Sequence, residues 1–326
     1  MSVKTLLKPQ GGENLCKSCS AEDIIDFKPI TPEDRELYNS YLFASCEKGC
    51  ENSFANVFMW GESKIATVHK HLVRLARFGS YTFYSYPLGT GDKTEVINAL
   101  IKDACARNIP FTMGGITPYD KEQMEEAFPC GFSYVERRNS FDYVYEIDAL
   151  ATLPGKKYHS KRNHCARFSK EHPDYRVVEI SEDNIHLAVE MSERWYKDKE
   201  VSSPEIDFEG EKAAIKRAFE SYFALGLEGI MLLDGNRVLA LTVGNRMSYN
   251  TFDINFEKAE AGVNGAYAAV NKEFASYLKE KYPEIEYLNR EEDMGLEGLR
   301  KAKESYYPHH MVVKHRAYPM EDADEN

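Results

Sequence analysis

The sequence predicts an α+β protein made of two similar halves, each with a mixed, mostly antiparallel sheet flanked by helices. Segments in which apolar residues alternate are interspersed with segments in which they recur every three or four positions. Their order (helix, three strands, loop, helix, strand, helix, strand) occurs twice along the 326 residues, a length that suits two domains. We therefore expect a polar leader over 1–27, domains over 28–150 and 151–320, and an acidic tail over 321–326.

The first half starts at a clear helix signal. Thr31 suits the N-cap, Pro32 suits the first helical position, and two acidic residues follow in the first turn. This helix should end near Ala44. Period-2 patterns then predict strands, and amphipathic patterns predict helices. The strands are expected at 64–70, 71–78, 81–86, 109–113 and 133–147, and the helices at 94–108 and 119–128.

The second half repeats this order. Asp234-Gly235-Asn236 predicts a hairpin turn between two strands, and the loop 258–265 leads directly into a helix. Helices are expected at 182–196, 208–225, 266–281 and 296–303, and strands at 229–233, 238–246, 249–256, 285–288 and 311–316.

Composition limits the function. The chain has 41 Lys+Arg against 53 Asp+Glu, a net charge of −12, which argues against general coating of nucleic acid but allows one focused contact. No apolar run approaches the roughly 20 residues that cross a bilayer, so we expect a cytoplasmic protein. The odd number of cysteines, 7, favours free thiols. We expect no metal site; a zinc site of Cys16, Cys19, Cys46 and Cys50 is the alternative.

One basic segment contrasts with this acidic chain. Between residues 156 and 170 it has no acidic residue, and hydrogen-bonding side chains such as Tyr158, His159 and Asn163 are interleaved with the cations. A local basic block favours an anionic ligand, most often phosphate. A solvated basic helix face is the alternative. The cations are Lys156, Lys157, Lys161, Arg162, Arg167 and Lys170.

Three motifs carry a family resemblance: LPGKKYHSKRNHCARF, GVNGAYAAVNKEF and YLNREEDMGLEGLRKAKESYYP. From about Phe27 to Tyr318 the chain resembles a bacterial family related to the C-terminal domain of phosphatidylglycerol lysyltransferase. The order of elements also resembles the GNAT acyltransferase fold. The resemblance implies two tandem GNAT-like domains akin to the Fem-type transferases, which move aminoacyl groups from charged tRNA to an acceptor. No multi-span membrane portion is predicted here, which argues against a lipid acceptor.

The loop before the predicted helix 266–281 is the expected cofactor site. Glycine lets the backbone approach a ligand closely, and a helix N-terminus attracts anions. In GNAT enzymes the pyrophosphate of coenzyme A binds there; a turn that merely needs glycine is the alternative. In the first half, Gly89-Thr90-Gly91 is followed by Asp92, which would repel phosphate, so that half is expected to be degenerate. The expected cofactor-binding residues are Gly262, Val263, Asn264, Gly265 and Ala266.

Acid–base chemistry requires one group to take a proton and another to return it. Asp253 and Glu257 flank the third strand of the second half, where the resemblance implies a base, and Tyr306 follows the last helix, where it implies an acid. Thr251, Asp253 and Asn255 should share one face of the strand. Residues 289–293, with Arg290 among three acidic residues, could bind a cationic group or supply a base; a capping and salt-bridge network that locks the following helix is the alternative. Donor or substrate binding is predicted at Lys156, Lys157, Lys161, Arg162, Asn163, Asn289, Arg290 and Arg300.

The sequence thus predicts an acyl- or aminoacyltransferase whose second half binds charged tRNA. An acetyl-CoA-dependent N-acetyltransferase that acts on a small amine, with coenzyme A as its cofactor, is one alternative. A catalytically inactive GNAT-fold binding protein is the other. The acceptor, either a small molecule or a lipid, and the oligomeric state are left open.

Overall fold

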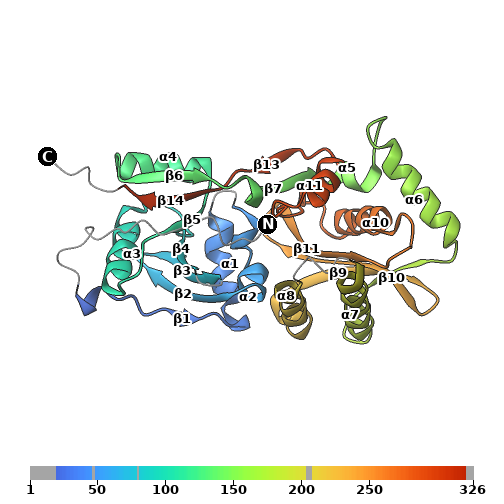
Figure 1. Cartoon of the computed structure of the whole chain (residues 1–326), viewed down its shortest axis with the longest axis horizontal. Coiled ribbons are helices and arrows are strands. Elements are labelled where there is room, and N and C mark those ends of the chain that lie inside the picture. Colours follow the sequence, from blue (N-terminus) through green and yellow to red (C-terminus); the bar gives the residue numbers. More distant parts are fainter. Residues whose placement is uncertain (1–19, 46–47, 79–80, 203–207, 321–326) are drawn as a thin grey trace.

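Two seven-stranded mixed sheets lie side by side in an elongated molecule (Figure 1). This computed structural model describes residues 20–45, 48–78, 81–202 and 208–320. The first sheet has the order β1 (Lys28–Pro29), β2 (Glu62–Val68), β3 (His71–Phe78), β4 (Tyr81–Ser85), β5 (Met113–Ile116), β14 (His315–Pro319) and β6 (Phe132–Glu136). The second has the order β13 (His310–Val312), β7 (Asp142–Glu146), β12 (Tyr287–Asn289), β11 (Thr251–Ala259), β10 (Arg237–Arg246), β9 (Leu227–Asp234) and β8 (Arg176–Glu179).

Helices cover both sheets. In the second half, α10 lies on one face of the sheet, and α7 and α8 lie on the other (Figure 1). Among the described residues, no helix combines the length and apolar character that crossing a membrane requires. The helices are α1 (Arg35–Ala44), α2 (Phe54–Met59), α3 (Thr94–Ala106), α4 (Pro118–Ala127), α5 (Ile147–Thr152), α6 (His159–Glu171), α7 (Ile185–Ser202), α8 (Glu209–Glu220), α9 (Tyr222–Leu225), α10 (Ala266–Lys281) and α11 (Glu297–Glu304).

Local capping explains several correct predictions. Thr31 and Asp34 form a capping box ahead of α1, in which the Thr31 backbone N–H donates to Asp34 Oδ2 at 3.0 Å. Helix α10 has the predicted bounds. The prediction of a strand over 109–113 was wrong, because β5 begins only at Met113. Helix α2 is short, has few local signals and was not predicted from the sequence.

The two sheets exchange strands. The predicted strand 133–147 is two strands: β6 pairs in the first sheet, whereas β7 pairs with β12 and β13 in the second. The predicted strand 311–316 is likewise divided, and β14 returns to pair between β5 and β6. A run of polar residues marks each break, at 137–140 and at 314–316. The domain boundary near residue 150 stays a prediction, and strands cross it in both directions.

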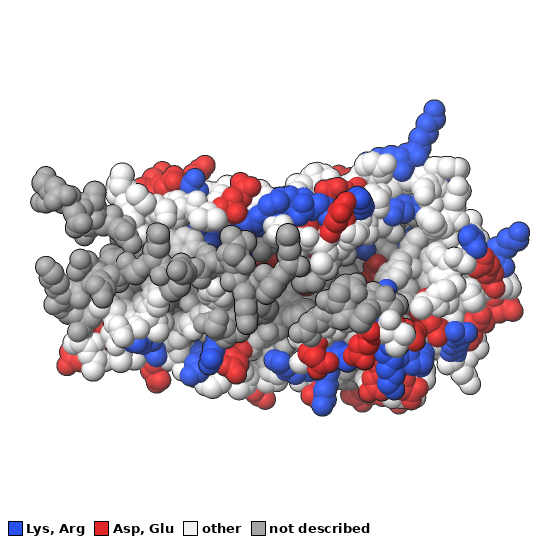
Figure 2. Space-filling view, viewed as in Figure 1, with Lys and Arg blue, Asp and Glu red and all other residues white. Residues whose placement is uncertain are grey.

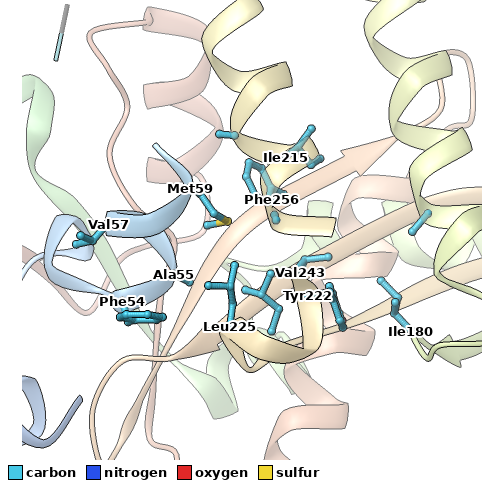
Figure 3. Packing of buried hydrophobic residues seen from close by; sticks show 14 of the residues in the cluster. Phe54, Ala55, Val57, Met59, Ile180, Ile215, Tyr222, Leu225, Val243 and Phe256 are labelled. Carbon is cyan, nitrogen blue, oxygen red and sulfur yellow. The ribbon is translucent and has the colours of Figure 1, made fainter. Parts of the chain in front are cut away.

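A shared hydrophobic core joins the halves. Phe54 and Met59 of α2 are 1% and 0% exposed and belong to the same cluster of buried residues as Ile215 of α8 and Phe256 of β11. Figure 3 shows these side chains converging from both halves. Two further clusters lie along the first and the second sheet, respectively. Because one core spans both halves, they should unfold together.

Replacement of Phe54 by Ala should lower the free energy of unfolding by about 3–5 kcal/mol, because it leaves a cavity in the shared core. We expect one cooperative transition in urea denaturation followed by both circular dichroism and tryptophan fluorescence. Phe43→Ala is the matched control. Because Phe43 on α1 is 41% exposed, this substitution should lower the free energy of unfolding far less. Two separate transitions in the wild-type protein would contradict the shared core.

Candidate functional site

The second sheet opens between β11 and β12. These strands run parallel and pair only through Thr251–Tyr287, Phe252–Leu288 and Asp253–Asn289. Strand β12 ends at Asn289, whereas β11 continues to Ala259. Polar residues lie on both sides of this opening: Asn255 and Glu257 on β11, and Arg290 and Glu291 after β12. Ligands of open sheets bind at such points, where neighbouring strands diverge.

A β-bulge distributes these polar groups over two faces. The pairing of β10 with β11 shifts between Val243 and Gly244, which leaves Asn255 as an extra residue. A Cβ on Gly244 would lie only 2.1 Å from the Asp253 carbonyl oxygen, so glycine permits this geometry. Because of the bulge, Asp253 faces α2 whereas Glu257 contacts α10, although the two residues are four positions apart and would share one face of a regular strand.

On the α10 side, four of the predicted residues meet. Arg290 Nη2 donates to Glu257 Oε1 at 3.0 Å, and its guanidinium lies 4.9 Å from the centre of the Tyr306 ring. Lys161 Nζ lies 3.8 Å from the same centre and donates to Ser305 Oγ at 2.6 Å. Burial, with Arg290 nearby, lowers the pKa of Lys161, and burial raises the pKa of Tyr306. Among the described residues, Arg290 Nη1 is buried without a hydrogen-bond partner.

On the α2 side, two carboxylates share their donors. Asn56 Nδ2 donates to Asp253 Oδ2 at 3.1 Å and to Glu291 Oε1 at 2.8 Å. Asn255 Nδ2 donates to the same two oxygens at 3.2 and 3.3 Å. Thus Asp253 and Asn255 do share one face, as predicted. Burial raises the pKa of Glu291 to about 7, and burial and the Glu291 charge raise the pKa of Asp253 well above its usual value.

Glu291 belongs to the cluster 289–293 that could supply a base, but it was not among the individual site residues predicted from the sequence. Its backbone is left-handed, with φ 57°, a conformation that costs a non-glycine residue energy and that concentrates at functional sites. Its backbone N–H donates to Asn289 Oδ1 at 2.8 Å, which holds the turn. The only sequence signal is its place just after a buried strand. Asn56 gave no signal, because it comes from the other half of the chain.

The glycine turn is partly structural. Gly265 has φ 79°, and a Cβ there would lie 2.2 Å from the carbonyl oxygen of His164 on α6, so close packing requires glycine. No side chain among the described residues caps the N-terminus of α10, and the Ala266 backbone N–H donates to the Val263 carbonyl at 3.4 Å. Val263 packs against the core of the second half, and Ala266 is buried. Coenzyme A binding at Gly262, Asn264 and this turn stays a prediction.

In the corresponding turn of the first half, the side-chain carboxylate of Asp92 bonds to the start of the following helix. Asp92 Oδ1 accepts from the backbone N–H of Thr94 at 2.9 Å, at the start of α3. A cavity of about 170 Å³ borders this turn, and in it Lys48 is neutralised by Asp120 at 2.6 Å. The expectation that the first half is degenerate stays a prediction.

The remaining predicted residues have various contacts. Lys156 and Lys157 are exposed before α6. Arg162 donates to two turn carbonyls, at 2.5 and 2.7 Å, and Asn163 contacts His159 at 3.2 Å. Asn289 is fully buried and donates to Asp142 at 3.0 Å, whereas Arg300 is paired with Asp293 at 2.9 Å. The binding roles of all these residues stay predictions. For Asn289 and Arg300, the contacts are of the kind expected of a structural network, which is the alternative to substrate binding.

Among the described residues, one group of three side chains has the residue types and the spacing that could bind a metal ion, and a buried lysine contacts all three. Cys50, Glu51 and Asp142 come together there. Lys314 Nζ lies 2.5 Å from Glu51, 2.6 Å from Asp142 and 3.6 Å from Cys50 Sγ. A metal ion would have to displace this ammonium. Cys16, Cys19 and Cys46 of the alternative zinc site lie outside the described residues.

The α+β architecture with two mixed sheets matches the solved structure of FemX, with a TM-score of 0.55, 9% identity and coverage of 91% of this chain and 98% of that one. This confirms the predicted fold class, two tandem GNAT-like domains. The chain belongs to the family described as phosphatidylglycerol lysyltransferase, C-terminal, whose model matches residues 44–318. The predicted family resemblance is therefore also confirmed.

Two further solved structures are similar along most of their length. A conserved protein of unknown function from Bacteroides thetaiotaomicron is 35% identical, with a TM-score of 0.86 and coverage of 91% of this chain and 100% of that one. L-PGS from Bacillus licheniformis is 15% identical, with a TM-score of 0.63 and coverage of 89% and 92%. Comparison with curated proteins gave no match.

The raised pKa of Glu291 has a consequence for stability. Its pKa of about 7 in the folded protein exceeds the usual 4.5, so its contribution to stability is complete below pH 4.5 and lost as the pH rises through 7. Glu291→Gln should therefore gain stability relative to wild type as the pH rises from 4.5 to 8, by at most about 3 kcal/mol. Urea denaturation at both pH values measures this. The exposed Glu297→Gln is the control, and an equal pH trend in both variants would contradict the assignment.

Proposed function

We propose that the protein is an aminoacyltransferase that takes an aminoacyl group from charged tRNA and transfers it to an acceptor. Membership in the lysyltransferase C-terminal family and the fold shared with L-PGS and FemX support this class of reaction. The observation that carries the proposal is the opening between β11 and β12, because cationic and carboxylate side chains flank it from different segments of the chain.

The cations of the site suit the donor. Arg290 is 12% exposed and has one buried N–H group without a partner among the described residues, and Lys161 lies on the same tyrosine ring. A guanidinium and an ammonium can bind a phosphodiester close to the ester of the donor. Further cationic side chains on helix α6 are exposed at the surface: Arg162, Arg167 and Lys170. Figure 2 shows Lys and Arg side chains protruding at the end of the molecule where Figure 1 shows α6.

Glu291 suits the proton transfer. In the proposed step, a nucleophilic X–H group of the acceptor attacks the ester carbonyl carbon; the X–C bond forms and the ester C–O bond breaks. Glu291 accepts the proton of the nucleophile and returns it to the departing ribose oxygen, so the tRNA leaves with a free hydroxyl. Asp253 would hold a proton next to Glu291, because two adjacent buried carboxylates resist ionising together. Glu257, paired with Arg290, would then position that cation.

The rate of transfer should depend on the protonation of Glu291. We expect kcat/KM to rise with pH and to level off above an apparent pKa near 7. Glu291→Gln should lower the rate about 100-fold or more and abolish this rise, since general bases contribute on the order of 10²–10⁴. The measurement is release of radiolabelled aminoacyl groups from mixed charged tRNA in the presence of a panel of amines.

Glu292→Gln is the matched control. The pKa of Glu292 is also raised to about 7 by burial, but its neighbouring charges are Lys314, Asp142 and Glu51. This variant should retain the pH profile. Loss of the rise in the Glu292 variant alone would refute the role of Glu291.

Binding of tRNA should depend on the basic residues before α6. The double variant Lys156→Glu, Lys157→Glu should bind tRNA at least tenfold more weakly and with a shallower dependence on salt, because fewer counterions are released. Filter binding at several salt concentrations measures both. Lys64→Glu, Lys102→Glu is the control, with two exposed lysines of the first half. Unchanged affinity, together with a higher melting temperature in coenzyme A, would favour the acetyltransferase alternative.

A further inference from the structure

Two consecutive histidines approach each other at the outer edge of the second sheet. His310 begins β13, which is the edge strand beside β7 (Figure 1), and His309 directly precedes it. Their Nδ1 atoms lie 2.9 Å apart, and the ring planes are inclined at 83°. Consecutive side chains of a regular strand point to opposite faces, so this approach depends on the bend of the chain at His309.

The surrounding fold holds both rings in place. The backbone N–H of His309 donates to the Val144 carbonyl of β7 at 2.8 Å, and His310 pairs with the same residue in the sheet. The ring of Tyr287 on β12 packs against both imidazoles, with its centre 5.4 Å from that of His309 and 5.7 Å from that of His310. Because backbone and rings are already fixed, a ligand that binds both nitrogens would cost little conformational entropy.

A carboxylate lies on the far side of the first ring. Glu146 Oε1 is 3.8 Å from His309 Nε2, and its side chain is 57% exposed, so a small shift lets it accept the Nε2 hydrogen. Histidines that bind metal ions usually donate their second N–H to a carboxylate in this way. The proton is then on Nε2, and the lone pair of His309 Nδ1 is directed toward His310.

The distance between the two nitrogens selects the kind of metal ion. With metal–nitrogen bonds of about 2.0–2.1 Å, nitrogens 2.9 Å apart subtend roughly 90° at the metal. That is the angle between neighbouring ligands in the square-planar and octahedral complexes of Cu²⁺ and Ni²⁺. The tetrahedral geometry of zinc sites requires the nitrogens to be about 3.3 Å apart.

We propose that His309 and His310 bind a divalent copper or nickel ion through their Nδ1 atoms, with Glu146 orienting the first imidazole. The 44% exposure of the His309 side chain gives the ion access from solvent. In the part of the chain that the structure describes, no third His, Cys, Asp or Glu side chain completes the pair. Water or an exchangeable ligand would therefore occupy the other positions.

This inference goes beyond the proposed function. The histidines contact Tyr287, where β12 begins, whereas the opening of the sheet follows Asn289, where β12 ends. Neither histidine takes part in the proposed transfer. His310→Gln should therefore leave the rate of aminoacyl release unchanged, and failure of one proposal leaves the other standing.

The test is calorimetric titration of the full-length, chelator-stripped protein with the chlorides of Cu²⁺, Ni²⁺ and Zn²⁺. The wild-type protein should bind one more Cu²⁺ than either His309→Gln or His310→Gln, and electron paramagnetic resonance should show two equatorial nitrogens for this ion. Glu146→Gln should keep both nitrogens but weaken binding about tenfold. Copper binds most tightly at almost any such site, so the angle is tested by nickel, which should bind more tightly than zinc.

His69→Gln is the matched control. His69 is an exposed histidine with the carboxylate of Glu95 at 3.3 Å, and it lies in the first half, far along the chain from the pair. This variant should bind all three metals as the wild-type protein does. Equal copper binding by the wild type and both histidine variants would overturn the site, and the imidazoles would then form only a hydrogen bond with each other. Loss in one histidine variant alone would mean binding to a single surface histidine and would overturn it too.

Discussion

The buried ion pair between Asp142 and Lys314 stabilises the region in which the chain crosses between the two sheets. Asp142 begins β7, just after the chain leaves the first sheet, and Lys314 precedes β14, just as the chain returns to it. Glu51 and the Cys50 backbone N–H complete the cluster from the first half. Removing one partner of such a pair leaves a buried charge uncompensated. The position of both sheets, and hence the site, depends on this contact.

The same junction supplies the site with residues from both halves. Asn56 of α2 reaches across to the carboxylates of Asp253 and Glu291, and the shared hydrophobic core keeps α2 in place. The bulge at Asn255 then separates two environments: a carboxylate pair on one face and the Glu257–Arg290–Tyr306 group on the other. A pair of carboxylates and a group that contains a cation thus lie at one opening without neutralising each other.

Local signals predicted much of the fold. The bounds of α10, the helix start at Thr31 and the paired strands β2 and β3 follow from periodicity, capping and turn chemistry, which act over a few residues. The sheet exchange was not predictable in this way. Residues 133–147 and 311–316 were each predicted as one strand, and only their long-range partners decide that each segment divides between two sheets.

The sequence by itself determined the family and the fold class, because motifs and periodicity are local properties. It also indicated Lys161, Glu257, Arg290 and Tyr306 as candidate site residues, whose roles stay predictions. Tertiary structure alone decided that these four meet, that Asp253 lies on the opposite face from Glu257, and that Glu291 is paired with Asp253. The physical reason is that burial, shared hydrogen-bond donors and the face of a bulged strand depend on neighbours distant in sequence. The role of Asn56, about 200 positions from Asp253, is the clearest case.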